Sequence, residues 1–282
     1  MTLLADLLKS FLNSRPRWNA SDVALARKIL SRLRPAAVLE QLRKDPALIM
    51  EMAGLRPDPW QFQLLRSPAP RSLLLCCRQA GKSTTAAALA LRVALLQPYS
   101  PVLLLSPSLR QSGELFRKVM SLFHTLHQPV GVVAATASRL ELANGSRILS
   151  LPGTEGTVRG FSGVALLVID EAARVADALY CSVSPMLAVS RGRLIALSTP
   201  YGKRGWFHDA WFSQEPWSRV EVPAPLCPRI SAAYLAEERR AIGERWFRQE
   251  MLCSFEDTVE SLFSHEDILA SFDPSLKAHT LL

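Results

Sequence analysis

Residues 76–84 carry side chains suited to binding phosphate, reading Cys-Cys-Arg-Gln-Ala-Gly-Lys-Ser-Thr between an apolar stretch and a helix-forming stretch. A loop that opens a helix points backbone N–H groups at an anion, and the helix dipole favours that anion. Lys82 would reach the β- and γ-phosphates of a nucleotide, and the Ser83 hydroxyl would ligate Mg²⁺. The usual pattern Gly-x-x-x-x-Gly-Lys-Ser/Thr is broken at its first position by Cys76. We predict a phosphate-binding loop; the alternative is an ordinary helix start.

Two adjacent carboxylates end the apolar stretch at residues 166–171, which reads Leu-Leu-Val-Ile-Asp-Glu. A carboxylate at a strand end beside a phosphate loop can hold the Mg²⁺ shell, which we assign to Asp170. Glu171 can then polarise the attacking water. The alternative is a helix N-terminus whose two acids complement its dipole. The 88 positions from Lys82 to Asp170 leave room for intervening strands and helices, which favours the catalytic interpretation.

A third polar group follows the apolar stretch 194–197, where the chain continues Ser198-Thr199-Pro200. Its two hydroxyls could sense the γ-phosphate and pass its loss to the next segment. The alternative is a plain Ser-Thr-Pro turn, and the residues alone leave both interpretations open.

A glutamine upstream of the loop is a candidate for recognising the base, in the sequence Asp58-Pro59-Trp60-Gln61. An amide presents both a donor and an acceptor, which suits the edge of adenine, and Trp60 could pack on the ring. An exposed helix start after a proline is the alternative.

Strands and helices must alternate to place these groups together. Apolar runs at 72–77, 102–106, 164–169 and 194–198 are interrupted by helical stretches at 82–96 and 109–126. This alternation predicts an α/β fold, a P-loop NTPase with a mostly parallel central sheet flanked by helices. Functional groups of such a sheet lie at the carboxyl ends of its strands.

An antiparallel hairpin insertion is expected around Asn144-Gly145, because this pair is flanked by alternating apolar and polar residues. Residues 1–53 are predicted to be a helical N-terminal region with Ser21-Asp22 as a helix start, residues 54–222 the core, and residues 223–282 a helical linker or lid. The charged stretch 231–250 is interpreted as a solvated helical face.

Composition is consistent with a polyanionic partner. The chain has 33 Lys+Arg against 25 Asp+Glu, a formal charge of +8. Its five cysteines show no zinc-ligand spacing, so they are expected to be reduced thiols. No signal peptide is recognised, and the apolar runs stay below the ~20 residues of a membrane span. A soluble, cytoplasmic protein is expected.

These motifs, in this order, resemble the ATPase half of phage terminase large subunits, the motors that package DNA into capsids. The resemblance covers most of residues 55–262. Terminases commonly carry Arg-Gln before the Gly-Lys pair, which accounts for the missing first glycine. The resemblance implies ATP and Mg²⁺ as cofactors, double-stranded DNA as the substrate that is moved, and a homo-oligomeric ring when active. It also implies the capsid portal protein and the small terminase subunit as partners.

The resemblance further assigns roles to individual residues. Arg78 looks like the loop arginine that contacts the γ-phosphate region, and residues 156–160 look like the segment that gives Arg159 to a neighbouring subunit. An arginine given in trans accelerates phosphoryl transfer by about 10³–10⁵-fold. Residues 198–200 match the family's coupling motif, and residues 106–111 resemble the segment after the second strand in related translocases. The expected ATP-binding set is Trp60, Gln61, Arg78, Gln79, Ala80, Gly81, Lys82, Ser83 and Thr84, and the expected catalytic set is Glu171, Lys82, Arg78 and Arg159.

Terminase large subunits usually continue into an RNase H-like nuclease domain. Too few residues follow Phe263 for such a domain, so we expect no DNA cleavage by this chain alone. Two alternatives remain open. A superfamily-2-like helicase fragment shares the motifs, but residues after Pro223 are too few and too helical for its second RecA-like domain. A non-catalytic prophage remnant that binds DNA or assembly partners is disfavoured by the intact Lys82, Ser83, Asp170 and Glu171.

Overall fold

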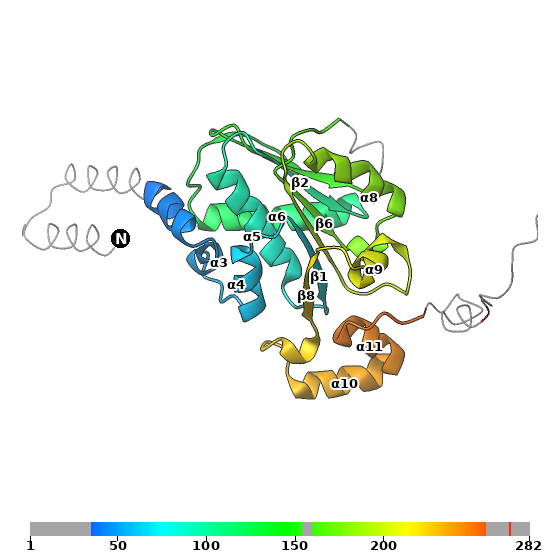
Figure 1. Ribbon diagram of the computed structural model, residues 1–282. Coiled ribbons are helices and arrows are strands. Elements are labelled where there is room, and N and C mark those ends of the chain that lie inside the picture. The colour runs from blue at the N-terminus through cyan, green and yellow to red at the C-terminus, as the bar shows by residue number, and fades with distance from the viewer. Residues whose placement is uncertain (1–34, 154–159, 258–270, 272–282) are drawn as a thin grey trace, which may run out of the picture.

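The structure, a computed structural model, describes residues 35–153, 160–257 and 271. Its centre is one eight-stranded sheet with the strand order β3-β4-β5-β2-β6-β7-β1-β8 (Figure 1). The strands are β1 (Arg71–Cys76), β2 (Pro101–Ser106), β3 (Val132–Ala135), β4 (Arg139–Leu142), β5 (Arg147–Pro152), β6 (Leu166–Asp170), β7 (Arg193–Ser198) and β8 (Ser218–Val222). The six strands from β5 to β8 in this order run parallel to one another, whereas β3 and β4 join them by antiparallel pairing. The predicted α/β class is confirmed.

Burial explains why the central strands read as continuous apolar runs. All five residues of β6 are buried, as are five of six in each of β1, β2 and β7. Parallel strands covered on both faces need apolar side chains on both faces. The strand ends that carry function therefore meet at one edge, because β6 pairs with β7 and β7 pairs with β1.

Helices cover both faces of this sheet. On one face lie α5 (Lys82–Leu96) and α6 (Leu109–Thr125), and the short helices α3 (Leu48–Met52) and α4 (Pro59–Arg66) pack against α5. On the other face lie α8 (Asp177–Val183) and α9 (Gly205–Phe212) (Figure 1). Residues 35–44 are also helical, which agrees with the predicted helical N-terminal region. The predicted helix start at Ser21-Asp22 lies outside the described residues.

The hairpin predicted at Asn144-Gly145 is present, since β4 and β5 pair antiparallel around it. Gly145 has φ 81°, the left-handed conformation that a tight turn requires. The Asn144 side-chain amide donates to the carbonyl of Ala94 at 2.8 Å, which fixes the turn against α5. Because β5 also pairs parallel with β2, the hairpin extends the main sheet instead of forming a separate insertion. The edge strand β3 was not predicted.

The C-terminal part differs from the sequence-based expectation in two ways. Strand β8 was not predicted, and it pairs parallel with β1 at the sheet edge. The predicted helical stretch 231–250 is two helices, α10 (Ala232–Ile242) and α11 (Glu244–Leu252), which separate at Gly243 with φ 79°. No residue of α10 is buried, so its charged side chains form the solvated face that was predicted. Within the described ranges, no helix is both long and apolar enough to cross a membrane.

Candidate active site

The loop between β1 and α5 has the backbone geometry of an anion-binding turn. Gln79 and Gly81 both adopt positive φ, 63° and 88°, and α5 begins at the next residue, Lys82. A Cβ at position 81 would lie 2.9 Å from the Gln61 amide nitrogen, so both the backbone angle and the available space require glycine. The loop therefore presents its backbone at a helix N-terminus, as predicted for a phosphate-binding loop.

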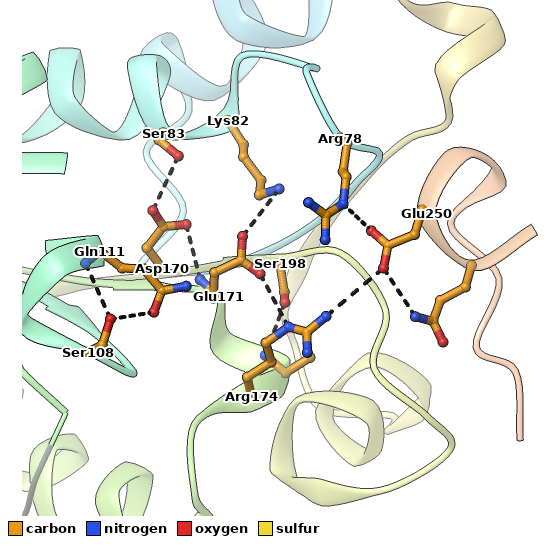
Figure 2. A network of polar contacts seen from close by, with 12 residues as sticks. Arg78, Lys82, Ser83, Ser108, Gln111, Asp170, Glu171, Arg174, Ser198 and Glu250 are labelled. Carbon is orange, nitrogen blue, oxygen red and sulfur yellow. Dashed lines mark hydrogen bonds and ion pairs between the residues drawn. The ribbon is translucent and has the colours of Figure 1, made fainter. Parts of the chain in front are cut away.

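Ser83 and Asp170 meet across the gap between α5 and β6. The Ser83 hydroxyl donates to Asp170 Oδ2 at 3.2 Å, and the Glu171 N–H donates to Asp170 Oδ1 at 3.0 Å (Figure 2). Burial raises the pKa of the Asp170 carboxyl above its ordinary value, and the neighbouring Glu171 charge adds to that effect. Lys82 and the two hydrogen bonds oppose the rise without cancelling it. A buried carboxylate of this kind is stabilised by a bound cation.

Glu171 lies between two cations. Its Oε1 is 3.6 Å from Lys82 Nζ, and its Oε2 is 3.8 Å from Arg174 Nε (Figure 2). Its backbone is left-handed, with φ 51°, at the point where β6 gives way to the short 3-10 helix η1 (Ala172–Arg174). A non-glycine residue held in this conformation carries backbone strain, and such strain concentrates at functional sites.

The predicted coupling segment touches the turn that follows Glu171. The Ala173 N–H donates to Ser198 Oγ at 3.2 Å, which joins the end of β7 to η1. Ser198 and Thr199 are both buried. The Arg174 guanidinium lies over the Tyr201 ring, 4.1 Å from its centre. The segment 198–201 is therefore in contact with Ala173 and Arg174, which follow Glu171.

Gln61 is buried, and both ends of its amide are bonded within the protein. Its Oε1 accepts the Asp58 N–H at 2.7 Å, which caps α4, and its Nε2 donates to Thr85 Oγ1 at 2.7 Å. Trp60 packs into the hydrophobic core. The contact with Thr85 attaches α4 to α5, while the role of Gln61 and Trp60 at adenine stays a prediction.

Three charged residues that the sequence reading missed contact the loop or its neighbours: Arg174, Arg229 and Glu250. Arg229 donates to Asp58 Oδ1 at 2.7 Å and to the carbonyl of Ala80 at 3.0 Å. Glu250 accepts from Arg78 Nε at 2.6 Å. One sequence signal could have indicated Glu250, because it is a carboxylate on the apolar face of α11, three positions after buried Phe247.

The predicted segment 106–111 is the turn from β2 into α6. Ser108 caps the N-terminus of α6 by accepting the Gln111 N–H at 3.3 Å. Arg159 lies outside the described residues, and its proposed action in a neighbouring subunit stays a prediction.

The donor set fits a magnesium ion. Ser83 offers a hydroxyl and Asp170 a carboxylate, and Mg²⁺ typically takes one or two carboxylates and fills its remaining positions with water and substrate phosphates. Among the described residues no group of three or more His, Cys, Asp or Glu could hold a metal by itself.

Asp170→Asn is expected to raise the melting temperature of the protein without metal or nucleotide by a few degrees at neutral pH. The folded pKa of Asp170 lies above the unfolded one, so the ionised carboxylate costs stability at neutral pH. That cost begins to fall as the pH drops below the folded pKa, and it is gone below the unfolded pKa. The difference between variant and wild type should therefore shrink in acid, and Mg²⁺ should stabilise the variant less. Thermal unfolding across pH measures both effects. Exposed Asp209→Asn is the control, and a lower melting temperature of Asp170→Asn at neutral pH would contradict this assignment.

The parallel sheet, the loop before α5 and the carboxylates at the end of β6 define the class of phosphate-loop NTPases. A family model described as terminase large subunit, T4likevirus-type, N-terminal, matches residues 73–270. The chain belongs to this family of phage terminase large subunits.

Individual relatives agree with the family match. The terminase large subunit of Thermus virus P23-45 is 27% identical over 256 residues, which cover 78% of this chain and 53% of that protein. The chain thus spans about half the length of the curated relatives it matches. The large terminase ATPase domain of Thermus phage P74-26 has a similar fold, with a TM-score of 0.65 and 22% identity over 73% of this chain and 96% of that one. The large terminase of bacteriophage D6E, in complex with ATP-gamma-S, has a TM-score of 0.57 and 13% identity over 70% of this chain and 52% of that one.

Proposed function

We propose that this chain binds ATP with Mg²⁺, hydrolyses it, and uses the energy to move double-stranded DNA into phage capsids. One observation carries the proposal. The loop residues Lys82 and Ser83 meet the two carboxylates at the end of β6, at 3.6 Å from Glu171 and 3.2 Å from Asp170. A phosphate loop joined to an adjacent pair of acids in this way contains the parts that ATP hydrolysis needs.

Each residue has a defined task in this reaction. Lys82 stabilises negative charge on the β- and γ-phosphates, and Glu171 accepts a proton from the attacking water. Ser83 and Asp170 hold Mg²⁺, which when bound offsets charge on the phosphates. Because Lys82 and Glu171 are paired in the structure, their ion pair must open as Lys82 turns to the phosphates and Glu171 to water.

The segment 198–200 is proposed to couple phosphate release to movement. Its support is the hydrogen bond from Ala173 N–H to Ser198 Oγ, only two residues from Glu171. A change at the γ-phosphate that moves η1 would therefore reach β7 and the residues after it. Arg159 from a neighbouring subunit is proposed to complete the site, which would make turnover depend on assembly.

The proposed partners follow from the family. They are double-stranded DNA, the capsid portal protein and the small terminase subunit, in a homo-oligomeric ring in the host cytoplasm. The D6E structures with ADP and with ATP-gamma-S support nucleotide binding by this chain. A packaging motor must accept any sequence, so DNA contacts should be mostly to the backbone and sensitive to salt. We also propose the division into a helical N-terminal region (1–53), a core (54–222) and a helical linker or lid (223–282), which rests on the shifts in composition along the chain.

ATP hydrolysis by the purified chain should rise with double-stranded DNA and with protein concentration. DNA brings subunits together, and an arginine supplied in trans acts only in an assembly. Phosphate release measured over a series of protein concentrations, with and without DNA, tests the proposal. The DNA stimulation should weaken steeply between low and high salt. Normal ATP binding without hydrolysis under any of these conditions would instead favour a non-catalytic remnant.

A further inference from the structure

Two buried cysteine thiols lie in contact beside the phosphate loop. The sulfurs of Cys77 and Cys227 are 3.7 Å apart, and both residues are free cysteines. Cys77 directly follows β1, and Cys227 directly follows the short 3-10 helix η3 (Ala224–Leu226). The two residues are 150 positions apart in the sequence, so the fold brings their sulfurs together. The reaction proposed above uses neither thiol.

The other cysteines of the described chain are placed differently. Cys253 donates its thiol to the main chain, to the carbonyl of Val222 at 3.4 Å and to that of Leu75 at 3.6 Å. Cys181 is exposed on α8. Within the described ranges, no second pair of cysteine sulfurs is joined by a hydrogen bond. The contact of Cys77 with Cys227 is therefore the one placed to become a covalent bond.

This contact makes the two thiols chemically unequal. The hydrogen bond that Cys77 donates lowers the pKa of the Cys227 thiol below its ordinary value. Burial and Asp58 oppose that effect, and the Arg229 guanidinium adds to it. The same hydrogen bond, together with burial, raises the pKa of Cys77. Because the thiolate is the reactive form of cysteine, Cys227 is the sulfur that would attack an oxidant and Cys77 the sulfur that would resolve the product.

A small oxidant has a short way to travel to this pair. Cys227 is buried, but Leu226, its neighbour in the chain, is 65% exposed. The segment 223–229 is therefore a thin cover over the two sulfurs, and a local opening of η3 would expose Cys227 first.

A bond between these sulfurs would act on the phosphate loop. Cys77 is joined directly to Arg78 and then to Gln79, whose backbone is left-handed with φ 63°. A disulfide bond is shorter than the present contact of the two sulfurs, so forming it draws Cys77 towards the segment 223–229. A displacement of about 1 Å in groups that position a substrate can cost about 10²-fold in rate. The bond would thus disturb the loop where phosphate is expected to bind.

We propose that Cys77 and Cys227 form a reversible disulfide with peroxide, and that this bond draws the phosphate loop out of its ATP-binding geometry. The Cys227 sulfur attacks one peroxide oxygen, the O–O bond breaks, and a sulfenic acid and one water form. The Cys77 sulfur then attacks the sulfenic sulfur, the S–O bond breaks, and a second water leaves. The two thiols lose two electrons and two protons, and peroxide is reduced to two waters. The disulfide goes beyond the proposed function, and only its effect on turnover rests on that function.

Peptide mapping of the whole chain after treatment with hydrogen peroxide tests the bond without any nucleotide. The remaining thiols are alkylated after unfolding, and linked peptides are identified by mass spectrometry. A peptide pair joining residues 77 and 227 should appear in the wild type and disappear after treatment with dithiothreitol. It should persist in Cys181→Ser, the matched control that removes the exposed cysteine, and be absent from Cys227→Ser. If both thiols stay free while Cys181 is oxidised, or if Cys227 becomes a sulfinic acid without a link, the inference is overturned.

ATP turnover measured on the same samples tests the effect on the loop. Oxidation should lower turnover of the wild type at least about tenfold, and dithiothreitol should restore it. Cys227→Ser should keep its turnover through the same treatment. A linked wild type with unchanged turnover would contradict the effect on the loop. A reduced wild type without turnover would instead contradict the proposed function, and the peptide map would still show whether the disulfide forms.

Discussion

Lys82→Ala is expected to lower ATP turnover by at least about 10²-fold, the loss seen when one well-placed group that stabilises transition-state charge is removed. Lys82 is the first residue of α5, its side chain is only 11% exposed, and its ammonium lies 3.6 Å from Glu171. No other lysine belongs to the loop 76–84, so the charge that it brings to the phosphates has no lysine substitute there. Steady-state phosphate release at saturating ATP and Mg²⁺ measures the effect.

The matched control is Lys118→Ala, which removes an exposed lysine from α6. It should leave turnover within a factor of about two, because surface substitutions away from a site have small effects. Circular dichroism should show that both variants keep the fold. Turnover by Lys82→Ala equal to that of the control would remove Lys82 from the site.

Glu171→Gln is expected to lower kcat by about 10²–10⁴-fold while ATP still binds. The amide keeps the size and shape of the side chain but cannot accept the proton of the attacking water. Asp170 and Ser83 remain to hold Mg²⁺, and Lys82 loses its partner in the ion pair, so the affinity for ATP should stay the same or rise. Separate measurements of ATP affinity and of kcat distinguish this result from simple loss of binding.

Glu215→Gln serves as the control for charge, since Glu215 is 61% exposed and pairs with Arg71 on the protein surface. It should change neither quantity. If Glu171→Gln weakened ATP binding and left kcat unchanged, Glu171 would be a binding residue and the base would have to be found elsewhere.

The contacts that sequence reasoning could anticipate are those between neighbouring strand ends. Apolar runs gave the strands β1, β2, β6 and β7, and parallel pairing then required their carboxyl ends to share one edge. For this reason the order of the motifs was enough to predict that Ser83 lies near Asp170 and Lys82 near Glu171. The contact of Ser198 with the turn after Glu171 follows from the same edge.

The contacts of Arg78 could not be anticipated in this way. Its partner Glu250 is 172 positions away on a helix that sequence patterns treat as surface, and no local periodicity encodes how that helix returns to the loop. Strand β8 was missed because only one of its residues, Val222, is buried, so it lacks the apolar run of a central strand. The contacts of Gln61 could not be predicted either. A glutamine amide can bind the edge of adenine, but it can equally form hydrogen bonds within the protein, as Gln61 does with Asp58 and Thr85.

Single-turnover hydrolysis measures most directly whether this chain's own loop and carboxylates hydrolyse ATP. Wild type and Glu171→Gln would each be mixed in excess with γ-labelled ATP, Mg²⁺ and double-stranded DNA, and bound ATP and released phosphate followed together. We predict that both proteins retain ATP but that only the wild type releases phosphate at an appreciable rate. Equal release by the two proteins, or bound ATP that neither hydrolyses, would contradict this expectation.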